Sequence, residues 1–409
     1  MKSAPISKPL QILEPALPPT MPHAEGAARG FALWNLGFRP FYLLASSFAA
    51  LSIALWVAQY VGWLPIAYLP TSVWHGHELI FGYTMAVMAG FLLTAVRAWT
   101  NQPTPSGMPL MAIALLWIAG RVLVLLPYAM VAAVVNAAFP AAVALAIAVP
   151  LVRSANRRNY FFVGLLLMLA AVVLTVHLSA MGLLQVPVRG GLQVGLDIVV
   201  FVMAVVGGRV IPMFTNNGVP NAGARRVAAV EKLALASLVA LFAADVVQAP
   251  AAWIATLAAI GAMAHAVRLC LWRPWRTHGA PLVWVLHAAY AWIVIYLVLR
   301  ALAAAGIVAE ALAIHALTVG AIGGMTMGMM TRTARGHTGR ALVADIWETA
   351  CFVLVQAAAV VRVFGGLIFP GGYVLTVATA GILWSTAFAL YAIRYWTVLS
   401  RARLDGKPG

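Results

Sequence analysis

Histidines inside long apolar stretches are the residues of this chain best suited to chemistry. The sequence WHGHE contains His75, His77 and Glu78 at the start of one such stretch, and His177 and His315 lie in two others. Imidazole is the commonest metal ligand, and a haem iron needs one or two axial side chains. These residues therefore indicate a metal site or a haem site.

The spacing within WHGHE limits what its side chains can do together. On a helix, His75 and Glu78 share one face, whereas His77 points about 200° away from His75. The two histidines therefore serve different sites, unless His75 precedes the first helical turn. Glu78 could accept a hydrogen bond from a histidine and orient it. The alternative is a helix cap at the membrane interface, with Trp74 in the aromatic belt.

Two other motifs offer weaker signals. In GGRVIPMFTNN, Pro212 breaks the helical pattern and leaves backbone carbonyls free, and Arg209 could bind an anion or a cofactor, or simply extend to the interface. The methionines of MTMGMMTR could bind copper(I), but they do not share one helix face, so packing is the better explanation. The chain has no CxxCH motif, so any haem would be held non-covalently.

The elements that position these residues must be membrane helices. Only 9% of the residues are charged and 64% are hydrophobic, whereas a soluble domain has about 25% charged residues. This composition excludes a soluble enzyme, a disordered chain and a disulfide scaffold, and it predicts an all-α integral membrane protein. The net charge of +16 comes from short basic runs between apolar stretches. That placement indicates membrane topology and not nucleic-acid binding.

The apolar stretches predict about twelve transmembrane helices, each near the ~20 residues that cross a bilayer. Their expected spans are 41–60, 74–96, 109–127, 129–149, 160–182, 191–215, 228–248, 252–271, 281–299, 308–331, 342–364 and 372–396. We expect a disordered cytoplasmic tail over 1–30, a single twelve-helix transmembrane domain over 31–400 and a cytoplasmic tail over 401–409. Both termini are cytoplasmic in this topology, because it leaves only Arg189 and Arg300 among the loop arginines outside.

A weak internal repeat accompanies this topology. The second, sixth and tenth expected helices begin at similar intervals, and Gly90, Gly208 and Gly324 fall in register. The pattern would give three blocks of four helices. Small residues also recur in any helix-packing seam, which is the simpler explanation.

Topology also sorts the ionisable side chains by depth. A common outer layer holds His75, His77, Glu78, His177, His315, Arg121 and Arg362. A haem ligated by two histidines needs one on each of two helices at matched depth. Both His77 with His315 and His75 with His315 meet this condition. The outer arginines could pair with haem propionates, whereas His265 and His287 lie in the inner half.

The chain resembles the NnrS family over six motifs that run in order from residue 37 to residue 340: GFRPFYLL, WHGHELIFGY, AGFLLTAV, GGRVIPMFTNN, WVLHAAYAW and HALTVGAIGGMTMGMMTRTARGHTGR. The resemblance implies a haem- and copper-containing membrane protein that accompanies denitrification and protects against nitric oxide. The histidines inside these motifs are His75, His77, His287, His315 and His337. The twelve-helix layout is also similar to that of haem-copper oxidases, whose low-spin haem is held by histidines on helices 2 and 10. This chain has no histidine on helix 6 or 7, so a dinuclear centre of that type is not expected.

We therefore expect a multi-pass protein of the bacterial inner membrane that binds b-type haem, with copper as a further candidate. It would reduce or detoxify nitric oxide with electrons from a quinol or another donor, and Glu78, His177 and His287 are the candidate catalytic residues. The alternative is a transporter of a metal, haem or metal-nitrosyl species, and a third hypothesis is a sensor or assembly factor that binds haem without turnover.

Overall fold

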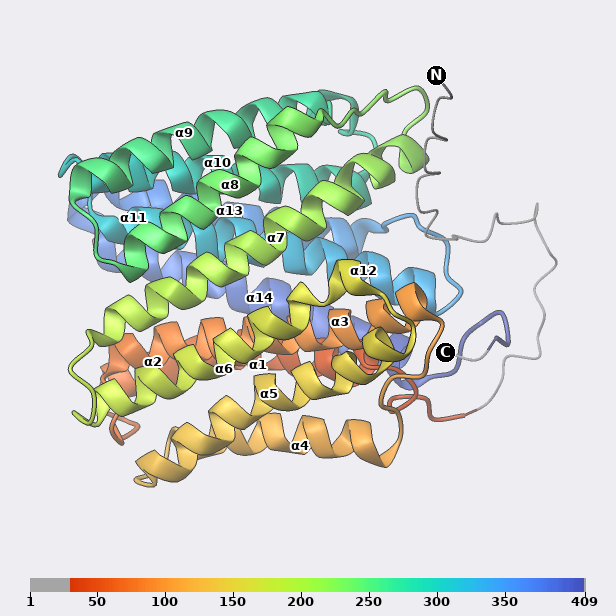
Figure 1. The fold of residues 1–409 in the computed structure, drawn as a ribbon, viewed down its shortest axis with the longest axis horizontal. Coiled ribbons are helices and arrows are strands. Elements are labelled where there is room, and N and C mark those ends of the chain that lie inside the picture. The colour runs from red at the N-terminus through yellow and green to blue at the C-terminus, as the bar shows by residue number, and fades with distance from the viewer. Residues whose placement is uncertain (1–29, 408–409) are drawn as a thin grey trace, which may run out of the picture.

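The computed structural model describes residues 30–407, and these form a bundle of long helices (Figure 1). The predicted tail over 1–30 lies almost entirely outside the described residues. The elements are α1 (Phe38–Tyr60), α2 (Thr71–His77), η1 (Glu78–Thr84), α3 (Met85–Thr100), α4 (Met108–Leu123), α5 (Ala129–Arg153), η2 (Arg157–Asn159), α6 (Phe161–Ala180), α7 (Val188–Gly218), α8 (Ala228–Val246), α9 (Ala251–Leu271), η3 (Pro274–Arg276), α10 (Pro281–Ala304), α11 (Glu310–His315), η4 (Ala316–Gly323), α12 (Gly324–His337), α13 (Ile346–Ile368), η5 (Pro370–Gly372) and α14 (Tyr373–Ser400).

The prediction of an all-α membrane protein is confirmed. In the described part of the chain, ten helical runs are long and apolar enough to cross a membrane. The other two expected spans correspond to α4, which has 16 residues, and α8, which carries Glu231, Lys232 and Asp245. Each expected span thus coincides with a helical run, while the number of crossings remains a prediction.

The helices run roughly along the long axis of the bundle and alternate in direction (Figure 1). Helices adjacent in sequence pack against each other from α5 to α10, and α1 packs against α14. The described chain begins and ends at the same end of the bundle, because Phe31 pairs with Arg401 and the Ala32 N–H donates to the Ser400 carbonyl at 2.7 Å. We call this the termini end and the opposite one the far end. That the termini end lies in the cytoplasm remains a prediction.

The last described residues fold back on the termini end. The Leu404 N–H donates to the Thr338 carbonyl at 3.1 Å, and Arg403 donates to the His337 carbonyl at 2.8 Å. Arg403 also forms an ion pair of 2.7 Å with Asp405. Residues 401–407 are therefore packed against the loop that follows α12.

Two of the helical runs contain a π-helical segment, and both segments begin directly after a histidine. η1 follows His77, and η4 follows His315. When these histidines are aligned, Gly82 corresponds to Gly320, and Gly90 corresponds to Gly328 instead of Gly324. The third helix of the expected repeat, α7, contains Gly208 and is α-helical throughout. Only two of the three helical runs therefore share the π-helical feature. π-helical turns widen the helix locally and are frequent at functional sites.

Candidate functional site

At the far end, α2 and α6 bring two buried histidines together. The ring centroids of His77 and His177 are 4.6 Å apart, with the ring planes inclined at 73°. Each ring is held by its Nδ1 atom. The Glu78 carboxylate lies 2.7 Å from His77 Nδ1, and the Tyr68 hydroxyl lies 2.8 Å from His177 Nδ1. Both Nε2 atoms are buried without a hydrogen-bond partner.

Unpartnered imidazole nitrogens are unusual in a protein interior, where most buried polar atoms are hydrogen-bonded. A carboxylate or hydroxyl on one ring nitrogen is the common arrangement for an imidazole whose other nitrogen binds a metal. Glu78 Oε2 is also buried and unpartnered. Within residues 30–407, however, no group of three His, Cys, Asp or Glu side chains is placed to hold one ion. The two Nε2 atoms could therefore supply at most two of the ligands that an ion would need.

A buried ion pair supports this histidine pair. Arg121 of α4 donates from Nη1 to Glu78 Oε1 at 2.6 Å and from Nη2 to Asn136 Oδ1. Asn136 is fixed in turn by its 2.8 Å bond to the Ala132 carbonyl. The Glu78 side chain is completely buried and that of Arg121 is 8% exposed. Arg121 has room because the neighbouring Gly82 lacks a Cβ atom, which would overlap the guanidinium.

His75 faces the opposite side of α2 and belongs to a different group. Its ring packs against Trp56, with 4.8 Å between the centroids. His315 of α11 and Arg362 of α13 are among the side chains within electrostatic range of His75. His315 Nδ1 lies 2.6 Å from the carbonyl of Ala311. Since a carbonyl can only accept, Nδ1 carries the proton and Nε2 has the free lone pair.

Two of the predicted site residues lie away from both groups. The His287 imidazole is bonded through Nε2 to the Thr215 hydroxyl at 2.8 Å and borders a shallow pocket beside His278, in the loop after η3. Arg209 donates to Asn159 Oδ1 at 2.9 Å, and its guanidinium lies 5.7 Å from the centre of the Phe161 ring. The structure thus separates these residues from the four far-end histidines.

The site also contains residues that the sequence did not indicate. Tyr68 lies in the loop before α2, where nothing in the sequence marks it. Asn136 is the one amide in the apolar stretch of α5, and an amide inside an apolar span is a signal that could have been used. Asn136 cannot ionise, so a search of the apolar spans for charged groups does not include it.

The comparison with known families agrees with the motifs. A family model described as NnrS protein matches residues 32–403. No curated protein matches the chain. Because the family match covers nearly the whole chain, the chain belongs to the NnrS family of nitric oxide-related membrane proteins.

Proposed function

We propose that this chain binds a b-type haem between α2 and α11, with His75 and His315 as axial ligands, and acts on nitric oxide in the bacterial inner membrane. The observation that carries the proposal is the state of His315. Its Nδ1–H is bonded to the carbonyl four residues earlier, so its Nε2 lone pair is available to iron. His75 and Arg362 lie within electrostatic range of it.

The other histidine pair does not fit a haem. A metal–imidazole bond is about 2 Å long, so two imidazoles on opposite faces of one iron hold their ring centroids about 6 Å apart. The centroids of His77 and His177 are 4.6 Å apart. His77 is held against His177, whereas His75 is the histidine of α2 within electrostatic range of His315. This supports the pairing of His75 with His315 over that of His77 with His315. His77 instead contacts His177, where a copper ion bound from one side would suit two imidazoles.

The residues around His75 and His315 have separate tasks in this proposal. The Ala311 carbonyl fixes the tautomer and the orientation of His315. Arg362 provides a cation for a haem carboxylate, and Trp56 packs against His75 and restricts its ring. Haem supplies an iron that binds nitric oxide or passes electrons to it. Glu78 and His177 are candidates for moving protons, because both are buried and each has an unpartnered atom.

Haem content and nitric oxide consumption test the proposal together. We would purify the wild type, His75→Ala and His315→Ala from cells supplied with haem, with His278→Ala as the control because His278 lies in an exposed loop. We expect stoichiometric haem in the wild type and the control, and loss of haem from both site variants. The wild type should also consume nitric oxide when a quinol is added. A folded wild type without haem would refute the proposal.

A transporter remains the second candidate, because two helical runs are interrupted by π-helical segments in the interior of the bundle. Interrupted helices are frequent at the binding sites of transporters. Proteoliposomes that accumulate haem or a metal, without consuming nitric oxide, would favour this function over the first one.

A further inference from the structure

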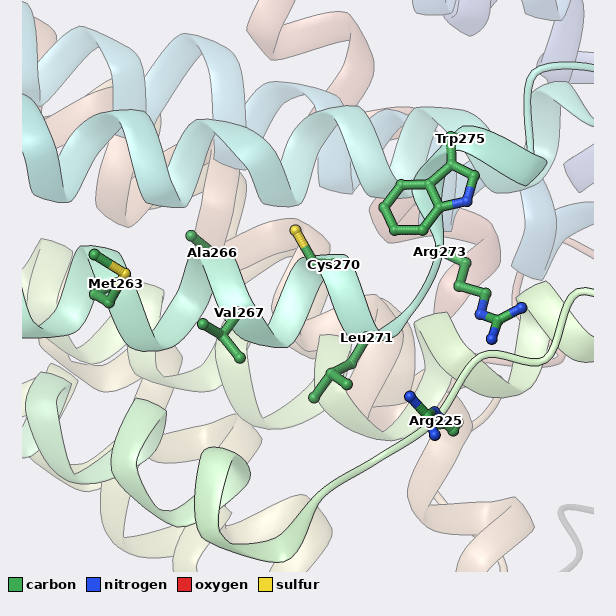
Figure 2. A pocket seen from close by; sticks show the side chains of 8 residues that line it. All are labelled: Arg225, Met263, Ala266, Val267, Cys270, Leu271, Arg273 and Trp275. Carbon is green, nitrogen blue, oxygen red and sulfur yellow. The ribbon is translucent and has the colours of Figure 1, made fainter.

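We propose that the groove at the termini end of α9 binds the phosphate of an anionic phospholipid, with the acyl chains along the exposed face of α9. The groove has a volume of about 590 Å³. Figure 2 shows its lining, in which Arg225 and Arg273 lie on segments that approach each other below Trp275. Met263, Ala266, Val267, Cys270 and Leu271 complete the lining from α9.

The polar groups of the groove select an anion. Arg225 and Arg273 are guanidinium groups, which only donate hydrogen bonds, and the Trp275 indole N–H also only donates. Neither arginine has an ion pair or a side-chain hydrogen bond among the described residues. A quinol needs acceptors for its hydroxyl groups, whereas a phosphodiester presents only acceptors. The lining therefore suits a lipid phosphate better than a quinol.

The backbone holds the two arginines at the groove. The Arg225 N–H donates to the Leu271 carbonyl at 2.9 Å, which fixes the loop after α7 against the end of α9. Arg273 adopts the left-handed conformation, with φ 57° and ψ 58°. Such a conformation is costly for a residue other than glycine and persists only where the surroundings enforce it. Arg276 donates to the Asn221 carbonyl at 2.7 Å, which joins this turn to the loop after α7.

The apolar part of the groove matches an acyl chain. Met263, Val267 and Trp275 are exposed side chains on one side of the α9–η3 segment, and Met263 is 68% exposed. A tryptophan beside arginines at the end of a membrane helix is typical of the lipid headgroup level. Basic pockets between helices on the cytoplasmic side bind anionic headgroups, and this end is the one that the loop charges place in the cytoplasm.

Native mass spectrometry of the full chain with added phosphatidylglycerol or phosphatidylcholine tests the proposal. The site variant is Arg225→Gln/Arg273→Gln. The control is Arg157→Gln/Arg158→Gln, which removes the same charge from exposed positions of η2 at the same end. Each arginine near an anionic surface strengthens binding about fivefold, so we expect the site variant, which lacks two, to bind phosphatidylglycerol about 30-fold more weakly. The control should bind it like the wild type.

Three results would overturn the proposal. One is equal binding of the two lipids by the wild type, a comparison that does not depend on any variant. Another is an equal loss of phosphatidylglycerol in the site variant and the control, which would indicate attraction by net charge alone. The third is a folded site variant that binds phosphatidylglycerol as well as the wild type does.

Discussion

Replacing Arg121 with methionine should destabilise the bundle more than any other single change at the far end. The guanidinium is the cation that faces Glu78, at 2.6 Å, and the carboxylate is completely buried. Methionine fills much of the volume of the arginine stem but leaves the carboxylate without this partner. Glu78 would then have to give up its charge or rely on the 2.7 Å contact with His77.

The magnitude follows from that choice. Breaking a buried ion pair by removing one partner costs about 3–5 kcal/mol, because a charge is left uncompensated. The remaining contact with His77 places the expected loss in the free energy of unfolding at the lower end, about 3 kcal/mol. In Glu78→Gln/Arg121→Met no charge is left, so the double variant should recover most of this loss.

Unfolding in mixed micelles of sodium dodecyl sulfate and a mild detergent measures these differences, with the two single variants and the double variant forming a thermodynamic cycle. Because Glu78→Gln also leaves a buried charge unpaired, we predict a coupling free energy of at least about 2 kcal/mol between the two positions. Two results would refute this reasoning. One is a free energy of unfolding of Arg121→Met within about 1 kcal/mol of the wild-type value, and the other is a double variant that is less stable than Arg121→Met.

Three further changes test the surroundings of the site. Gly82→Ala places a Cβ 3.0 Å from a neighbouring aromatic ring and into a guanidinium, so it should cost about 1–3 kcal/mol of unfolding free energy. The control Gly164→Ala has open space around its Cβ and should not destabilise the protein. Tyr68→Phe removes the 2.8 Å bond to His177 and should cost about 1 kcal/mol without changing the haem absorption spectrum. Asp345 caps α13. Partial burial raises the pKa of its carboxyl, but the backbone N–H groups and an arginine outweigh this and hold that pKa below its usual value of 3.8. Asp345→Ala should therefore cost about 1 kcal/mol at neutral pH, and the difference should vanish as the pH falls through the lowered pKa; a constant difference would contradict this.

The positions of the helices could be predicted from the sequence, because a bilayer requires long apolar spans. Each expected span coincides with a helical run. The sequence also predicted that His75 and His77 serve different sites, since the helical period places them on opposite faces. In the structure, His75 faces Trp56, whereas His77 faces His177.

The partners of these side chains could not be predicted. Depth placed Glu78 and Arg121 in one layer, but their contact depends on how α4 packs against the π-helical segment η1 and on the missing side chain of Gly82. The π-helical segments have no signature in the apolar pattern. Both segments follow a histidine, and counting from these histidines matches Gly90 with Gly328, whereas the sequence register matched it with Gly324.

The most direct test of the proposed haem site is a measurement of its axial ligands. Electron paramagnetic resonance and near-infrared magnetic circular dichroism of the ferric protein distinguish two imidazole ligands from one imidazole and one thioether. We predict two imidazoles in the wild type, and one imidazole with one thioether in His75→Met and in His315→Met. The same ligands in both variants as in the wild type would show that the haem is not held by His75 and His315, and would contradict the account.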